Sequence, residues 1–282
     1  MSESTEAGRP GWIVIEPESA PSSLRLGELW AYRELLGLFA WRDVTVRYKQ
    51  SVLGILWALL TPLVTVVLFS LIFGRLANIP SDGIPYPIFC YAGLLPWLFF
   101  AQSVQRATAS MVAERNLLTK VYFPRLIVPV AATLAPLVDL AIASTILAAM
   151  MAWYHLVPNA HAFYLVPLCL LWAWLVAVGV GALLSALNVY FRDVGQMIPF
   201  LIQVWMYASP VVYPTSLLPG DLRWVHALNP IVGVIDGLRF ALLSRGELPG
   251  SSILVSLSVS VVLVAVGIAC FARMERSFSD VV

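Results

Sequence analysis

The feature that most constrains this chain is a run of 52 consecutive residues without formal charge, between Asp139 and Arg192. An α-helix rises about 1.5 Å per residue and the hydrocarbon core of a membrane is about 30 Å thick, so one helix of this length would be more than twice too long to cross. The segment HLVPNAH, His155–His161, is polar, contains a proline and is the convincing place for a turn. The run therefore predicts two membrane-spanning helices joined at this turn.

The rest of the chain has the same apolar character, since 60% of its residues are apolar, 12% are charged and its mean hydropathy is +0.85. A soluble fold of 282 residues does not hide this much apolar surface from water, so the bilayer must be the solvent. Uncharged runs of about 20 residues mark membrane spans. We expect an all-α integral membrane protein with six transmembrane helices, at residues 51–73, 87–104, 126–154, 162–187, 197–213 and 251–271.

Basic residues divide unequally between the two faces that these spans define. Six Lys or Arg residues precede the first span, four lie between the second and third, one lies between the fourth and fifth, and two follow the sixth. One face therefore collects 13 of the 17 basic residues, and the positive-inside rule predicts that both termini are cytoplasmic. The net charge of +1 argues against nucleic acid as a partner. The polar first twenty residues predict no cleavable signal peptide.

The segment before the first span predicts an amphipathic helix. We expect a flexible cytoplasmic tail at 1–25, a transmembrane domain at 26–275 and a cytoplasmic C-terminal tail at 276–282. Residues 26–41 place Leu29, Tyr32, Leu36 and Phe39 on one helical face. Such a helix either lies in the inner membrane interface or docks against the protein, and the pattern fits both.

Asp139 is the one acidic residue inside a clearly apolar run, in the third predicted span. A carboxylate at membrane depth costs about 2.5–3.5 kcal/mol on insertion scales and marks a functional site by default. A proton relay needs further ionisable groups in the spans, and the sequence offers none. We therefore favour a structural hydrogen bond or a protonated carboxyl over a proton pathway.

Small residues recur at every fourth position of the fourth span, at Ala177, Gly181 and Ser185. Such a stripe lets a second helix approach closely. We expect another span to pack there.

The region 214–250 holds two apolar pieces, 224–228 and 231–243, each too short to cross a membrane. Asn229-Pro230 separates them, which predicts a re-entrant pair of short helices. Asp236 and Arg239 are three residues apart and are expected to pair on one helix.

Several kinds of chemistry are missing from the sequence. No GxxxxGK[ST] motif is present, so the chain cannot cradle nucleotide phosphates. The three histidines and three cysteines have no metal-ligand spacing, and the cysteines fall in predicted spans as apolar packing residues. We expect no catalytic residue, no metal and no cofactor in this chain.

Several blocks of sequence carry a family resemblance. They are RELLGLFAWRDVTVRYKQSVLGILWALLTPL, YAGLLPWLFF, LLTKVYFPRLIVP, LSALNVYFRD, YASPVVYP and LNPIVGVIDGLRFALL. In this order they resemble the permease subunit of type-2 ATP-binding-cassette exporters of lipid-linked polysaccharide, the O-antigen, capsule and teichoic-acid exporters. The resemblance covers about residues 24–275. The resemblance implies that two copies of the chain form a homodimer in the bacterial inner membrane, surrounded by membrane lipids. It also implies two cytoplasmic ATPase subunits that bind ATP and Mg, and an undecaprenyl-linked glycan as the substrate.

The resemblance also implies roles for particular segments. Residues 28–41 would be the interface helix, about 107–118 the coupling segment for the ATPase, and 224–243 the outer re-entrant pair. The coupling candidates are Arg106, Met111, Glu114, Arg115 and Asn116. The conduit-lining candidates are Trp57, Phe69, Trp205 and Tyr207. The headgroup candidates, close to the inner interface, are Arg33, Arg42, Arg47 and Lys49.

Each of these roles has an alternative. The coupling segment could be a solvated connector, the aromatic residues could form interfacial belts that contact lipid, and the arginines and the lysine could serve only to fix orientation. For the whole chain, the alternatives are a type-2 permease for a drug or small lipid, an ion-coupled secondary transporter, and a membrane-embedded transferase. The sequence does not say which glycan is carried.

Overall fold

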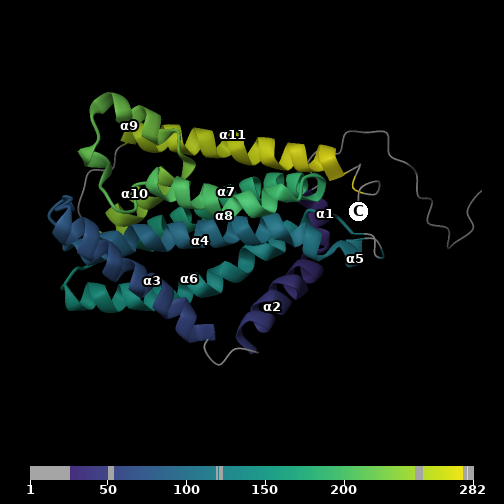
Figure 1. Ribbon diagram of the computed structural model, residues 1–282, viewed down its shortest axis with the longest axis horizontal. Coiled ribbons are helices and arrows are strands. Elements are labelled where there is room, and N and C mark those ends of the chain that lie inside the picture. The colour runs from purple at the N-terminus through teal and green to yellow at the C-terminus, as the bar shows by residue number, and fades with distance from the viewer. Residues whose placement is uncertain are drawn as a thin grey trace, which may run out of the picture.

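The computed structural model describes residues 26–49, 54–118, 120, 123–244, 250–275 and 278. The predicted N-terminal tail, the beginning of the first predicted span and most of the predicted C-terminal tail lie outside these residues. Within them the fold is all-helical, as predicted, and contains no strand (Figure 1). The elements are α1 (Leu26–Ala31), α2 (Arg33–Lys49), α3 (Gly54–Phe69), the π-helix η1 (Ser70–Leu76), α4 (Tyr86–Ala113), α5 (Arg115–Leu118), α6 (Ile127–Trp153), α7 (Ala162–Tyr190), α8 (Asp193–Tyr207), the 3-10 turn η2 (Thr215–Leu217), α9 (Gly220–Ala227), α10 (Pro230–Leu243) and α11 (Gly250–Met274).

Among the described residues, five stretches are long and apolar enough to cross a membrane: Leu56–Leu76, which combines α3 and η1, and the helices α4, α6, α7 and α11. They correspond to the predicted spans one to four and six. The turn expected within the long uncharged run is present, because α6 ends at Trp153 and α7 begins at Ala162. Helix α4 continues to Ala113, nine residues past the predicted end of the second span.

The fifth predicted span differs from the structure. Helix α8 covers Asp193–Tyr207, so it begins four residues and ends six residues earlier than predicted. The helix ends where Pro210 approaches, because proline disfavours helical backbone at the residue before it and has no N–H of its own. With 15 residues, α8 is about 22 Å long. The helix is therefore shorter than a complete span.

The two short helices predicted for the re-entrant region are present, and their re-entrant arrangement in a membrane stays a prediction. Helices α9 and α10 are bent by 107° at the break between them. Asn229 produces the break, since its side chain accepts a hydrogen bond from the backbone N–H of Ile231 and caps α10, and Pro230 occupies the first helical position.

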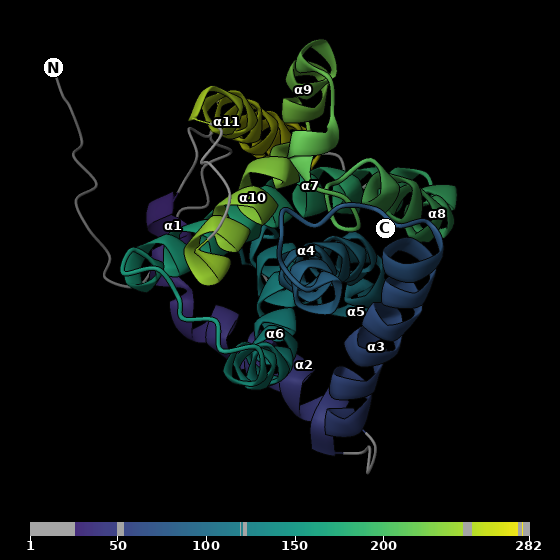
Figure 2. The same cartoon turned by 90° about the vertical axis from the view of Figure 1, so that its left-hand side faces the viewer.

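Helix α4 lies at the centre of the bundle, between α6 and α7 (Figure 2). Its large side chains are buried, with Tyr91 and Phe100 fully enclosed. The predicted stripe of small residues on α7 is the surface that meets α4, because a Cβ at Gly181 would lie 2.5 Å from the Cβ of Ala107. The stripe therefore sets the distance between α4 and α7.

The helical domain begins and ends on the same side of the bundle (Figure 1). Phe39 of α2 stacks on Phe123, with ring centroids 5.9 Å apart, and the Tyr190 hydroxyl at the end of α7 donates to the carbonyl of Met274 at the end of α11. We call this side, which carries α1, α5 and the last turns of α7 and α11, the basic end.

The segment before the first span forms α1 and most of α2, and α2 shows the docking alternative that the sequence left open. Helix α2 packs on α6 and buries Phe39, while Trp30 and Trp41 stay 72% and 70% exposed. One face of α2 therefore docks on the protein, whereas Trp30 of α1 and Trp41 in the middle of α2 leave surface for a membrane interface, a role that stays a prediction.

Candidate functional site at the basic end

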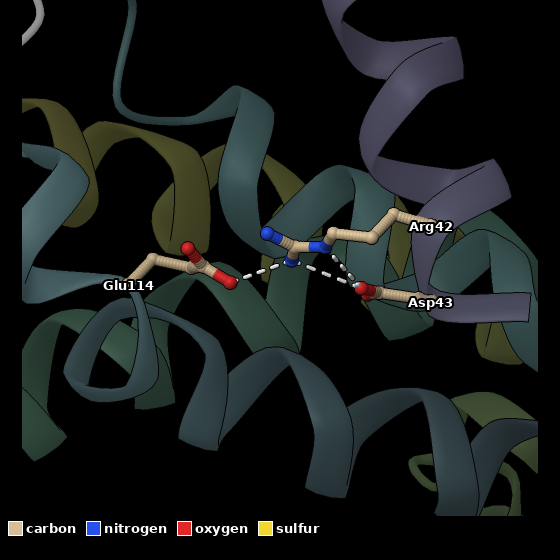
Figure 3. Close-up of polar contacts among 3 residues, drawn as sticks. All are labelled: Arg42, Asp43 and Glu114. Atoms are coloured by element: carbon tan, nitrogen blue, oxygen red, sulfur yellow. Dashed lines mark hydrogen bonds and ion pairs between the residues drawn. The ribbon is translucent and has the colours of Figure 1, made fainter. Parts of the chain in front are cut away.

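Arg42 connects α2 to the end of α4 (Figure 3). Its Nη2 lies 2.5 Å from Glu114 Oε1 and 3.0 Å from Asp43 Oδ1, and its guanidinium lies 5.1 Å from the centre of the Phe39 ring. The hydrogen bond to Glu114 raises the pKa of Arg42, with a smaller contribution from Asp43. Glu114 is the residue that caps α4. The contact joins a headgroup candidate to a coupling candidate, which the sequence had placed in separate sets.

A second contact joins α2 to the middle of α6. Arg47 Nη2 lies 2.8 Å from Asp139 Oδ2, and the Tyr48 hydroxyl donates a hydrogen bond to Asp139 Oδ1. Burial and the bond to Asp139 together raise the pKa of Tyr48 to about 12. This supports the structural role that we favoured for Asp139, since both carboxylate oxygens face groups on α2.

A cavity of about 420 Å³ lies between α2, α4 and α6. Its charged lining residues are Arg42, Asp43, Arg106 and Glu114. Arg106 forms no hydrogen bond or ion pair with the part of the chain that the structure describes, whereas Arg42 is held by two carboxylates. The cavity therefore offers one guanidinium group without a hydrogen bond or ion pair to the described residues, on a residue whose backbone lies about 10 Å before the end of α4. Arg106, predicted for coupling, faces this cavity.

The remaining headgroup candidates lie on the exposed side of α2. Arg33 and Lys49 are exposed, and Arg33 donates to the carbonyl of Trp30 at 3.3 Å. The headgroup role of all four residues stays a prediction.

Apart from Arg106, the coupling candidates lie at the corner between α4 and α5. Arg115 and Asn116 of α5 are exposed to solvent, although each has an interaction within the chain. Met111 is only 1% exposed and packs in the core with Phe123 and Ile127. The Met111 side chain is therefore part of the core beneath this corner. A partner that binds at the corner would contact Glu114 and α5.

The aromatic conduit candidates have different surroundings. Trp57 and Tyr207 are 60% and 50% exposed, whereas Phe69 is partly buried. Trp205 packs edge-on against Phe100, with centroids 5.1 Å apart, and its ring N–H donates to Asn229 Oδ1 at 2.9 Å. A conduit role stays a prediction for these residues, and Trp57 and Tyr207 have the most surface free for it.

Sequence reasoning missed two residues that fix the site. Tyr48 gave no signal because its partner Asp139 is 91 residues away. Asn188 donates to the carbonyl of Thr108 and accepts from the backbone N–H of Gly195, so it ties α4, α7 and the start of α8 together. An amide at the end of an apolar run was the signal available for Asn188. No group of metal-ligating residues occurs among the described residues.

Known proteins match this chain over most of its length. The family model described as "ABC-2 type transporter" matches residues 34–243. The O-antigen export system permease protein RfbA of Myxococcus xanthus is 32% identical over 260 residues, covering 90% of this chain and 97% of the relative. A protein of the same name from Klebsiella pneumoniae is 26% identical over 88% of this chain and 95% of the relative. The polysialic acid transport protein KpsM of Escherichia coli is 24% identical over 84% of this chain and 92% of the relative.

Proposed function

Because this chain belongs to the ABC-2 type transporter family, we propose that it is the permease subunit of an ATP-driven exporter of lipid-linked polysaccharide. The main observation in support of this proposal is that the chain is 32% identical, over 90% of its length, to an O-antigen export permease. The polysialic acid transport protein, which also matches, is named for another polysaccharide. These names favour a glycan over a drug or small lipid as cargo.

In the proposed assembly, two copies of the chain lie in the inner membrane and bind two cytoplasmic ATPase subunits. The ATPases hold ATP and Mg, and an undecaprenyl-linked glycan passes between the two copies. Helices α3 and α8 lie on the same flank of the bundle (Figure 2) and present exposed apolar side chains such as Trp57, Leu68, Phe200 and Val204. That flank suits a second copy of the chain. The basic end would face the cytoplasm.

The test compares the chain with and without its partner. In proteoliposomes containing the chain and an ATPase from the same gene cluster, we expect the lipid-linked glycan of the host to stimulate ATP hydrolysis and to move across the bilayer. We expect no hydrolysis from the purified chain alone. Hydrolysis by the chain alone would refute the division of labour, and stimulation by a drug or short lipid without transport of the glycan would favour the other cargo.

The contact between Arg42 and Glu114 provides a test of coupling in the same proteoliposomes. Arg42→Glu and Glu114→Arg each place like charges together, whereas the double exchange restores an opposite pair. We expect each single variant to reduce glycan-stimulated hydrolysis and the double variant to recover most of it. Equal loss in all three variants would show that the pair itself does not connect α2 to the ATPase.

A further inference from the structure

A second and larger cavity, of about 790 Å³, lies at the end of the bundle opposite the basic end. It is bounded by the loop between η1 and α4, the turn that contains η2, helices α9 and α10, and the first residues of α11. Figure 2 looks onto this end, with α9 and α10 above the centre. Its volume falls within the range of about 300–1,000 Å³ of small-ligand sites.

Four charged side chains line this cavity without pairing with one another. Asp82 accepts from the Ser216 hydroxyl at 2.8 Å, and Asp236 accepts from the Thr215 hydroxyl at 2.7 Å. Arg223 donates to the carbonyls of Ser216 and Leu218. The expected pairing of Asp236 with Arg239 is wrong, because no ion pair forms between these two described side chains. Asp236 instead accepts its hydrogen bond from Thr215, in the turn that contains η2. The charges of Asp236 and Arg239 are therefore not neutralised by each other.

Arg239 shows most clearly that the site is incomplete. It is 6% exposed, and its guanidinium carbon lies 3.7 Å from the centre of the Phe89 ring. Nη2 donates to the carbonyl of Val211 at 2.7 Å and Nε to that of Phe89 at 3.3 Å, whereas Nη1 has no partner among the described residues. A buried charged donor left unpaired is costly. The positive charge of Arg239 is therefore only partly compensated within the described residues, and it lies in the wall of the cavity.

The remaining lining is aromatic and hydroxylic. Trp224 is 50% exposed, and Phe240 lies next to Arg239 in the wall. Ser251 and Ser252 complete the opposite side. An aromatic plane beside carboxylates, guanidinium groups and hydroxyls suits a ligand that has an apolar face and polar edges.

We propose that this outer cavity binds a saccharide. Each sugar hydroxyl is both a donor and an acceptor, so a ring in the cavity can donate to Asp236 while its apolar face covers Trp224. A simple anion would meet Asp82 and Asp236, and a simple cation would meet the two arginines. The proposal rests on the proposed function only for the source of the sugar, which would be the exported glycan as it leaves the membrane.

The experiment measures saccharide binding to the full chain in nanodiscs by saturation-transfer NMR. The probes are mannotriose, oligosaccharides released by mild acid from the surface polysaccharide of the host, and inorganic phosphate. We expect the wild type to bind a saccharide probe that phosphate does not displace. Trp224→Ala and Asp236→Asn should each weaken binding about three- to tenfold, since each removes one contact of about 1 kcal/mol.

Trp153→Ala is the matched control, because Trp153 is also an exposed tryptophan, at 80%, but ends α6 outside the cavity. It should bind as the wild type does. Asp236→Asn keeps an acceptor for Thr215, so it tests the charge without removing that bond. The proposal is overturned if neither saccharide binds, if the two cavity variants bind as tightly as the control, or if phosphate displaces the sugar. This assay needs no ATPase and no transport, so its failure is separate from failure of the proposed function.

Discussion

Replacing Asp139 with asparagine tests whether the carboxylate acts as a structural tie or as part of a transport mechanism. The side chain of Asp139 is 8% exposed and that of its partner Arg47 is 28% exposed. Breaking a fully buried ion pair costs about 3–5 kcal/mol, and solvent reaches Arg47, so the loss is smaller. Asparagine still accepts the hydrogen bond from Tyr48. We expect Asp139→Asn to lower the free energy of unfolding by about 1–3 kcal/mol.

The assay is thermal unfolding of the purified chain in nanodiscs, at one scan rate because membrane proteins unfold irreversibly. At about 2–4 °C per kcal/mol, the expected fall in Tm is several degrees. Arg47→Gln should cause a similar fall, and the double variant should be nearly as stable as either single variant, because it leaves no unpaired charge. Asp221→Asn, in the exposed first turn of α9, is the matched control and should leave Tm unchanged.

Export by the same variant decides between the two roles. If Asp139 is a structural tie, glycan export by folded Asp139→Asn should remain close to that of the wild type at a temperature well below its Tm. Complete loss of export with an unchanged Tm would refute this interpretation. That result would support an ion-coupled mechanism.

Two further outcomes follow from the packing and from the raised pKa of Tyr48. A Cβ at Gly267 would overlap the carbonyl of Gly179, so Gly267→Ala should separate α7 from α11 and cost about 1–3 kcal/mol, whereas Gly37→Ala, with open space around it, should not lower Tm. Equal Tm values for the two variants would contradict the close packing. Because the pKa of Tyr48 is raised from 10.0 to about 12, the folded state holds this proton more tightly, and the stability it adds below pH 10 is lost as pH rises towards 12. Tm should therefore fall more steeply over this range in the wild type than in Tyr48→Phe, and parallel curves would contradict the assignment.

The sequence predicted the spanning helices because the length of an uncharged run can be compared directly with the thickness of the bilayer. It did not predict where the helices begin and end. Arg106 marked the end of the second predicted span, yet α4 continues to Ala113 because a cavity beside α2 and α6 receives the arginine. Pro210 ended α8 inside a run that carries no charge, so a boundary drawn from charge alone passed over the proline. The apolar composition of a segment sets how many residues can be surrounded by lipid. Whether the helix continues past a charged residue depends on a neighbouring helix that surrounds the charge.

The polar partners depended on contacts far apart in the chain. The sequence offered Asp139 no ionisable neighbour within the spans, and its partners come from α2, a helix outside them. Conversely, the local spacing of Asp236 and Arg239 suggested a pair, and the fold separates them by giving each a different neutral partner. Sequence spacing predicts contacts along one helix, and these contacts are weak enough for tertiary neighbours to replace them.

The short helix α8 changes the thickness of the barrier that the bilayer presents. Its 15 residues span about 22 Å, about 8 Å less than a typical hydrocarbon core, whereas the central helix α4 and its neighbour α7 have 28 and 29 residues. Lipid next to α8 must thin to match it, or the tilt of α8 must decrease, at a cost of a fraction of a kcal/mol per ångström of mismatch. Hydrophobic mismatch is thereby concentrated on the flank that α8 shares with α3. If the proposed glycan moves along this flank, it crosses a shorter apolar distance there than beside α7.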